Sequence, residues 1–282
     1  MSRFLLLFAV SFMLTGITAR SQVVIIFGGK VPGYLSNYEI GYSYSFTAVN
    51  QVQTFTLPDG SVHEFKSNQV RSLMSPGVYI GWSLALKKLG MQKRSALGLN
   101  IGMQENMFLW SHTSKTWGKT SWAIDGTGQD GFYDEETIGM SMQIGVPVSL
   151  DFKFGFDALK YKNIRWASSV GIGVMPQFTM SAGIPNFESE SFAIGVTPFI
   201  KGDIGFFAGI AMKLRAQVGF GVMPMADSRN SMFGGMSGGI FGENSGVKHE
   251  YKVNAPVQAT ISFIIMPFSW TWGEKGWWNT YR

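Results

Sequence analysis

The clearest pattern in the chain lies at Ile138–Phe154, which reads IGMSMQIGVPVSLDFKF. Every even-numbered residue in it is apolar, and almost every odd-numbered residue is small or polar. This period of two predicts a β-strand, because successive side chains of a strand leave its opposite faces. A strand of a soluble domain usually has about 5–6 residues, whereas a tilted strand that crosses a bilayer needs roughly 9–11. The length of the run therefore favours a membrane-spanning strand.

The same alternation recurs and predicts an all-β chain of about eight strands. The connections after the second, fourth and sixth strands are short, whereas those after the other strands are long. This asymmetry is typical of an antiparallel up-and-down outer-membrane barrel with short periplasmic turns and long extracellular loops, which would put both termini in the periplasm. In the first long connection, Pro58-Asp59-Gly60 predicts a hairpin between Val52–Leu57 and Val62–Phe65. The predicted strands are Tyr38–Ala48, Gly77–Lys88, Ser95–Phe108, Thr137–Phe154, Asn163–Thr179, Ser191–Ile204, Ile210–Met223 and Lys252–Ile265.

The ends of the chain predict export to the cell envelope. Residues 1–21 have the basic, apolar and small-residue sections of a signal peptide, whose apolar section Phe4–Leu14 is too short for a membrane-spanning helix. The predicted organisation continues with a periplasmic segment at 22–37, the barrel at 38–266 and an aromatic-rich tail at 267–282. A further strand at Val23–Phe27, or in the tail, stays open.

The composition excludes several classes of chemistry. The chain has no cysteine, which removes disulfides, a lipid-anchoring cysteine, thiol catalysis and thiolate metal sites. Without residues 1–21, which include Arg3 and Arg20, the chain keeps 21 basic and 18 acidic residues, a net charge of +3. This small excess gives no argument for a nucleic-acid partner.

The second face of the strands distinguishes a membrane barrel from a soluble β-protein, which stays the alternative. It carries Gly, Ser and Gln instead of the charged and Thr-rich residues of a solvated face. Aromatic residues gather towards strand ends, as the girdles of membrane barrels do. The girdle candidates are Trp110 and Phe178 at the outer ends, and Phe152, Phe154, Trp166, Phe268 and Trp270 near the inner ones. Taken together, the pattern resembles the small eight-stranded outer-membrane β-barrel proteins of Gram-negative bacteria, a likeness of architecture with no diagnostic motif.

Charged residues predicted to face inward all fall near the periplasmic ends of their strands. They are Glu39, Lys87, Asp151, Lys153, Arg165, Lys201, Asp203, Lys213 and Arg215. One interpretation is a plug of salt bridges and hydrogen bonds, because side chains just fill an eight-stranded barrel and buried charges must be paired. The other is an anion-attracting constriction in a narrow porin-like channel, because six basic groups face three acidic ones. The outer half of this face carries glycine and uncharged polar residues, which could line a vestibule.

Catalytic signals are weak. His112 and Ser114 resemble the His-x-Ser pair of outer-membrane lipid A deacylases, which implies a histidine base and a serine nucleophile, with Glu105 or Asp125 as the orienting acid. A polar loop start explains the same residues. No histidine has a partner at metal-ligand spacing, so neither a metal nor a cofactor is predicted.

Aromatic residues in the outer loops are candidates for contact with a protein or glycan, or for capping the barrel. They are Trp117, Trp122, Phe132, Tyr133 and Phe241. The sequence therefore predicts a non-enzymatic outer-membrane protein with a structural, surface-binding or envelope-assembly role and with membrane lipids as its surroundings. A narrow channel and a lipid hydrolase are the alternatives.

Overall fold

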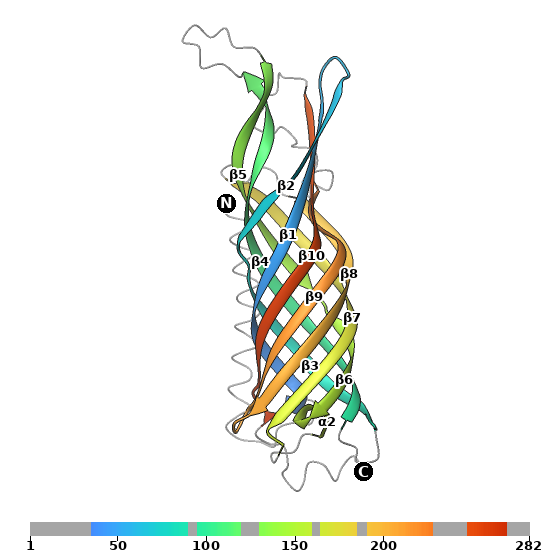
Figure 1. The fold of residues 1–282 in the computed structure, drawn as a ribbon. Helices are drawn as coiled ribbons and strands as arrows, with labels where there is room; N and C mark the ends of the chain where they lie inside the picture. Colours follow the sequence, from blue (N-terminus) through green and yellow to red (C-terminus); the bar gives the residue numbers. More distant parts are fainter. Residues whose placement is uncertain are drawn as a thin grey trace.

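The structure, a computed structural model, describes residues 35–89, 95–119, 130–159, 164–184, 191–227 and 247–269. Almost all of these residues lie in antiparallel strands that close into a barrel (Figure 1). The elements are η1 (Leu35–Asn37), β1 (Tyr38–Thr56), β2 (Val62–Met74), β3 (Pro76–Leu89), β4 (Ser95–Lys119), β5 (Asp130–Gly145), β6 (Val148–Gly155), α2 (Phe156–Leu159), β7 (Trp166–Ile184), β8 (Ser191–Phe207), β9 (Ala211–Asp227) and β10 (Lys248–Met266). Within the described ranges, neither short helix is long and apolar enough to cross a membrane.

The wall of the barrel is a ring of eight strands, as predicted. β1 closes the ring by pairing with β10 from Ile40↔Ile265 to Thr56↔Lys248. Two of the eight wall strands are interrupted: β2 and β3 form one, and β5 and β6 form another. The ring is therefore an antiparallel up-and-down β-barrel.

Prolines explain both interruptions, because proline has no backbone N–H to donate to a neighbouring strand. β3 begins at Pro76, and Pro147 separates β5 from β6. The pairing with β4 keeps the same register on both sides of Pro147, since Gln104 pairs with Gly145 and Ile101 with Val148. Gly102 N also donates to Pro147 O at 3.0 Å, so the interruption leaves the wall in register.

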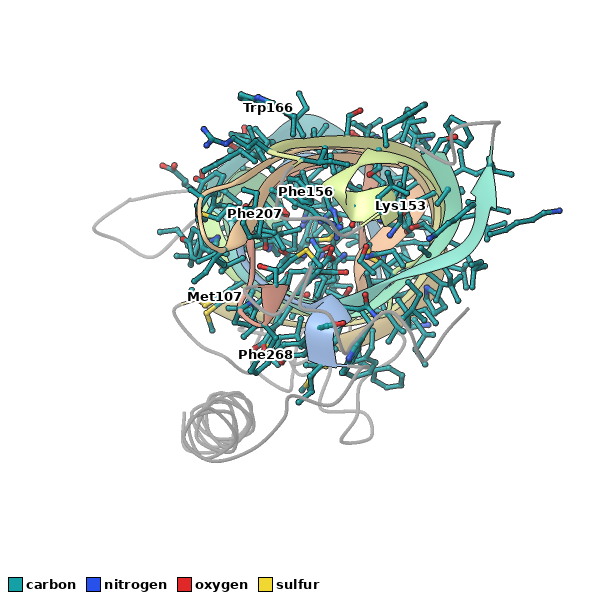
Figure 2. All side chains as sticks on the ribbon, turned by 90° about the horizontal axis from the view of Figure 1, so that it is seen from below. Met107, Lys153, Phe156, Trp166, Phe207 and Phe268 are labelled. Carbon is teal, nitrogen blue, oxygen red and sulfur yellow. The ribbon has the colours of Figure 1, made fainter. Side chains whose placement is uncertain are left out.

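The facing of the side chains follows the predicted alternation. In β9, Lys213 is 1% exposed, whereas the next residue, Leu214, is 53% exposed. From Gly139 to Lys153, the odd-numbered residues are buried and the even-numbered ones are largely on the outside, except for the buried Met142. Figure 2 shows the ring along its axis, with Trp166 and Met107 outside and Phe156 inside. The apolar face therefore looks outward, and the polar face is enclosed.

The strands extend further than predicted at the end with the long loops. The Pro58-Asp59-Gly60 hairpin is confirmed, since β1 and β2 pair up to Thr56↔Val62 and Gly60 has a φ of 86°. β4 continues beyond the predicted end at Phe108 to Lys119, where it pairs with Asp130 of β5. β4 has 25 residues, whereas a strand that crosses a bilayer needs only roughly 9–11, so β4 is much longer than a membrane crossing requires.

The upper parts of β1, β2, β4, β5 and β10 therefore project beyond the closed ring (Figure 1). We call these parts the projecting strands: residues 50–56, 62–70, 112–119, 130–137 and 248–252. Their surface carries the ion pairs Lys66–Glu64, Lys115–Asp134 and Lys248–Glu250. Charged pairs of this kind place the projecting strands in water rather than in lipid.

One girdle prediction is wrong. Trp110 is buried inside the barrel, where its Nε1 donates to Ser141 Oγ at 3.0 Å. Phe268 lies near the short-turn end, as predicted, and is buried there because it packs against Tyr38, with Ile40 and Ile80 beside them. Phe152, Phe154 and Trp166 are exposed near that end, as the girdle requires.

Several predictions lie outside the described residues. They are the signal peptide, the segment through residue 34 with its possible strand at Val23–Phe27, the loop residues Trp122, Asp125 and Phe241, and the tail beyond Ser269.

Candidate functional site

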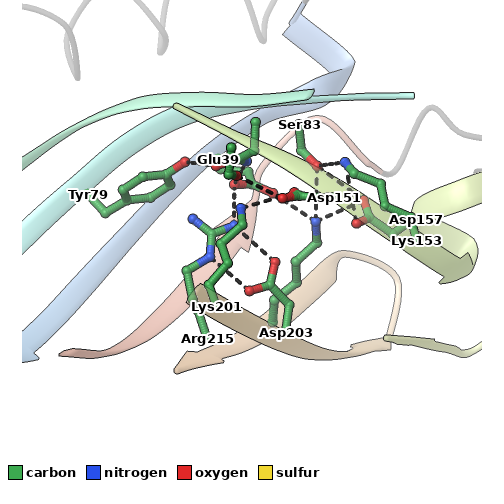
Figure 3. Close-up of polar contacts among 12 residues, drawn as sticks. Glu39, Tyr79, Ser83, Asp151, Lys153, Asp157, Lys201, Asp203 and Arg215 are labelled. Atoms are coloured by element: carbon green, nitrogen blue, oxygen red, sulfur yellow. Dashed lines mark hydrogen bonds and ion pairs between the residues drawn. The ribbon is translucent and has the colours of Figure 1, made fainter. Parts of the chain in front are cut away.

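The short-turn half of the lumen holds a network of charged side chains (Figure 3). Lys213 is at its centre: its Nζ lies 2.7 Å from Glu39 Oε1 and 2.8 Å from Asp157 Oδ1. The other oxygen of Glu39 accepts from Arg215 Nη2 at 3.0 Å and from Asn100 Nδ2 at 3.0 Å. One carboxylate on β1 thus binds side chains from β4 and β9, and so joins widely separated parts of the wall.

Arg215 has the most directional contacts of the network. Its Nε and Nη2 donate to the two oxygens of Asp203 at 2.9 and 3.0 Å, the bidentate geometry that a planar guanidinium favours. The guanidinium also lies over the ring of Tyr79, 4.7 Å from its centroid. The hydroxyl of Tyr79 donates to Asn100 Oδ1 at 2.9 Å. This contact orients the side-chain amide of Asn100, whose Nδ2 donates to Glu39.

The network reaches β6 and the helix α2. Lys153 Nζ is hydrogen-bonded to Ser83 Oγ and lies 3.6 Å from Asp157 Oδ2. Burial by itself would raise the pKa of Asp157, but the ammonium groups of Lys153 and Lys213 hold that pKa below its ordinary value. Lys201 Nζ lies 3.0 Å from Asp151 Oδ2, whose other oxygen accepts from Ser149 at 2.7 Å.

Seven of the nine predicted lumen charges take part in this network, and two do not. Lys87 is exposed because the register of β3 against β4 shifts between Ala85 and Lys87, which turns its side chain outward. Arg165 is exposed because it precedes the first residue of β7. Sequence reasoning missed Asp157, which lies in a turn where strand alternation says nothing about facing.

These corrections change the charge balance of the lumen. The network has four acidic members and four basic members, so its formal charges cancel. The acids are Glu39, Asp151, Asp157 and Asp203, and the bases are Lys153, Lys201, Lys213 and Arg215. The excess of basic groups that suggested an anion-attracting constriction is therefore absent from the described network.

An uncharged polar layer occupies the lumen next to the charge network. Gln143 is its centre: it accepts from Asn106 Nδ2 at 3.0 Å and donates to Gln177 Oε1 at 3.0 Å. Gln258 Nε2 donates to Gln143 at 3.2 Å and to Ser45 Oγ at 3.3 Å. The glycine-rich face thus accommodates amides that cross the barrel where the sequence suggested a vestibule.

A third layer is apolar and lies beyond the amides, towards the projecting strands. Its members are all buried residues on the inner face: Val49, Phe108, Trp110, Met223, Met225, Val253 and Ala255. Apolar side chains packed across a lumen exclude water, because water gains no hydrogen bonds there. The other end is covered by Phe156, Ala167, Ala211 and Met266. Described side chains therefore occupy the lumen in three successive layers and cover its short-turn end.

An aromatic cluster holds the projecting strands together. Phe132 lies at its centre, with ring-centroid distances of 4.7 Å to Trp117, 4.8 Å to Phe65 and 5.3 Å to Phe55. Phe55 also stacks on His249 at 4.2 Å. Of the predicted loop aromatics, Trp117 and Phe132 thus pack against neighbours, whereas Tyr133 is 40% exposed. Burial lowers the pKa of His249 to about 4.

The predicted hydrolytic pair lies in β4 and not in a loop. His112 pairs with Thr137 and Ser114 with Glu135 on β5. Glu105 lies seven residues before His112 on the same strand, about 23 Å away at a rise of 3.3 Å per residue. Glu105 therefore cannot orient His112. Across the described ranges, no group of three His, Cys, Asp or Glu side chains could hold a metal ion.

Comparison with known proteins adds little to this description. No protein-family model matches the sequence, and neither does any curated protein. Among solved structures, Neisserial surface protein A matches with a TM-score of 0.30 and 9% sequence identity. The matched region covers 80% of this chain and 96% of the Neisserial protein. The outer membrane protease OmpT from Escherichia coli has a TM-score of 0.35 and 7% identity, covering 81% and 96%. Ail of Yersinia pestis, solved with the heparin analogue sucrose octasulfate, has a TM-score of 0.24 and 6% identity, covering 81% and 99%. Similarities this low carry no argument about function.

Proposed function

We propose that this chain is an integral outer-membrane protein with a closed barrel, which displays the projecting strands at the cell surface as a non-enzymatic binding or envelope-assembly element. The observation that carries the proposal is the inside-out distribution of residues. Aliphatic side chains such as Ile172, Ile194 and Ile204 are more than 60% exposed, while the charged network is enclosed. An apolar belt of this size on a water-soluble monomer would drive aggregation, whereas lipid tails cover it favourably.

The filled lumen supports a structural and binding role rather than conduction. An ion moving through the barrel would have to displace the Glu39–Lys213–Asp157 contacts, the amides around Gln143 and the apolar layer around Trp110. Each layer is closed by side chains from opposite parts of the wall. We expect no step conductance from the purified protein in planar bilayers, and regular steps would favour the channel.

The projecting strands support the binding role. Their inner side is fixed by the aromatic cluster around Phe132, and their outer side offers alternating charges such as those of Lys66 and Glu64. A rigid, hydrophilic surface suits recognition of a protein or glycan, because little conformational entropy is lost on binding.

The orientation is the testable core of this proposal. Because the chain has no cysteine, single cysteines report on their own positions. Val62→Cys lies in the projecting strands and Ala208→Cys in the short turn between β8 and β9, and both positions are exposed. A membrane-impermeant maleimide should label Val62→Cys in intact cells, but Ala208→Cys only after the outer membrane is permeabilised. The reverse pattern would reject the proposed orientation, and equal labelling in intact cells would reject a membrane location.

A further inference from the structure

The short-turn end of the barrel carries exposed basic side chains without an acidic partner. They are Lys87 and Lys88 at the end of β3 and Arg165 just before β7, and none of them forms an ion pair within the described part of the chain. On the projecting strands, by contrast, three lysines have acidic partners. We call Lys87, Lys88 and Arg165 the basic collar.

The charge network in the lumen leaves the basic collar without a counter-charge. The carboxylates in the described short-turn half of the barrel are the four acids of that network. All four are buried, and the four basic groups of the network already balance them. The basic collar therefore keeps three positive charges at the outer surface, which favour contact with an anionic partner.

An irregularity in the wall places Lys87 on the outer face. The register of β3 against β4 shifts between Ala85 and Lys87, and shifts of this kind turn side chains towards the other face. Lys87 thus lies opposite Leu97, which in turn lies opposite Phe152 of β6. Leu97 and Phe152 are both exposed on the outside. At about 4.8 Å per strand spacing, the backbones of Lys87 and Phe152 are about 10 Å apart.

The aromatic girdle gives the depth of the basic collar in the membrane. Exposed aromatic residues gather at the level of the lipid headgroups, and Phe152 and Trp166 are such residues at this end. Lys87 lies in the same row as Phe152, and Arg165 directly precedes Trp166. Lysine and arginine extend their aliphatic stems along apolar surface and carry the charge into the headgroup layer. The charges of the basic collar therefore lie at the level of the lipid phosphates.

An exposed apolar surface adjoins Lys87 on the side of the membrane core. It consists of Leu97 and Ile101 of β4 and Leu150 of β6, which are neighbours because Leu150 pairs with Leu99. A molecule that satisfies both surfaces has an anionic head and an apolar tail. A soluble anion would leave the apolar side chains uncovered. A zwitterionic lipid would bring its own cation close to the lysines.

We propose that the basic collar binds the headgroup of an anionic phospholipid, whose acyl chain lies along Leu97, Ile101 and Leu150. The inference rests on the membrane location proposed above, and it adds a preferred lipid for the leaflet at the short-turn end. Lys87 and Lys88 are adjacent in the chain and reach the same headgroup. Arg165 adds positive charge further round the ring.

Native mass spectrometry of the folded protein tests the preference. Phosphatidylglycerol or phosphatidylcholine is titrated into the protein in detergent micelles, and the dissociation constant of the first bound lipid is measured. Each basic side chain near an anionic headgroup favours binding by about fivefold, so the parent should prefer phosphatidylglycerol by about a hundredfold. Lys87→Gln/Lys88→Gln should reduce this preference to about fivefold and leave phosphatidylcholine binding unchanged.

The matched control, Lys66→Gln/Lys248→Gln, removes the same charge from the projecting strands and should bind both lipids as the parent does. Lys87→Arg/Lys88→Arg should keep the preference, because it keeps the charge. Heat-modifiable migration on a gel verifies that each variant is folded, and the single variants replace a double variant that is not.

A folded parent without a preference for phosphatidylglycerol would overturn this inference alone. The same holds if Lys87→Gln/Lys88→Gln keeps the full preference, or if the control loses as much, since the effect would then follow net charge and not position. A parent that binds neither lipid and shows no heat-modifiable barrel would overturn the proposed membrane location as well.

Discussion

Glu39→Gln is the substitution that most directly challenges the closed lumen. The side chain is fully buried, and its two oxygens accept from Lys213 at 2.7 Å, from Arg215 at 3.0 Å and from Asn100 at 3.0 Å. A glutamine keeps the shape but loses the charge, and its amide N–H groups face donors instead of acceptors. Removing one partner of a buried ion pair typically costs about 3–5 kcal/mol, so we expect the free energy of unfolding to fall by that amount.

The assay is urea unfolding in phospholipid vesicles, followed by tryptophan fluorescence. Lys87→Gln is the control: Lys87 is exposed, and we expect its loss to change the free energy by less than about 0.5 kcal/mol. The double variant Glu39→Gln/Lys213→Met keeps the network neutral, so it should lose about 0.5–3 kcal/mol less than the sum of the two single variants. A Glu39→Gln protein as stable as the parent, or strictly additive losses, would refute a charge network that acts as a unit.

Two further predictions concern the projecting strands and the glycine-lined wall. Because burial holds the pKa of His249 at about 4, against about 6.5 in the unfolded chain, the folded state favours the neutral ring. Stability should be constant above about pH 6.5 and fall by up to about 3 kcal/mol as the pH drops towards 4, seen as faster proteolysis of the projecting strands. His249→Phe should remove this pH dependence, and an unchanged profile would contradict it. A Cβ at Gly139 would lie 2.2 Å from the indole of Trp110, so Gly139→Ala should cost about 1–3 kcal/mol in the urea assay. Gly202→Ala, whose Cβ would meet nothing closer than 3.8 Å, should be nearly neutral, and equal effects of the two would count against the packing around Trp110.

The sequence predicts the wall well because one physical rule governs it. An apolar face outside and a polar face inside impose an alternation, which is visible in β9 and from Gly139 to Lys153 and which places seven of the nine predicted charges in the lumen. The hairpin at Pro58-Asp59-Gly60 could also be predicted, because the preference of these three residues for a turn depends only on their own backbone conformations.

What the sequence could not give depends on long-range geometry. The register shift at Lys87 comes from the pairing of β3 with β4, and alternation within one strand does not record it. Trp110 reads as a girdle residue until the register places it opposite Gly139, whose missing side chain leaves room for the indole. Asp157 joins the network through a helical turn, where the period of two no longer applies.

The central claim is that the apolar face of the wall meets lipid tails. Nitroxide labels at single cysteines along Ser169–Val174 of β7 test it directly, through their accessibility to oxygen, which partitions into lipid, and to a water-soluble nickel complex. Oxygen accessibility should rise and fall with a period of two and peak at Val170, Ile172 and Val174. High accessibility of those three positions to the nickel complex, with low values for oxygen, would mean that water surrounds the barrel.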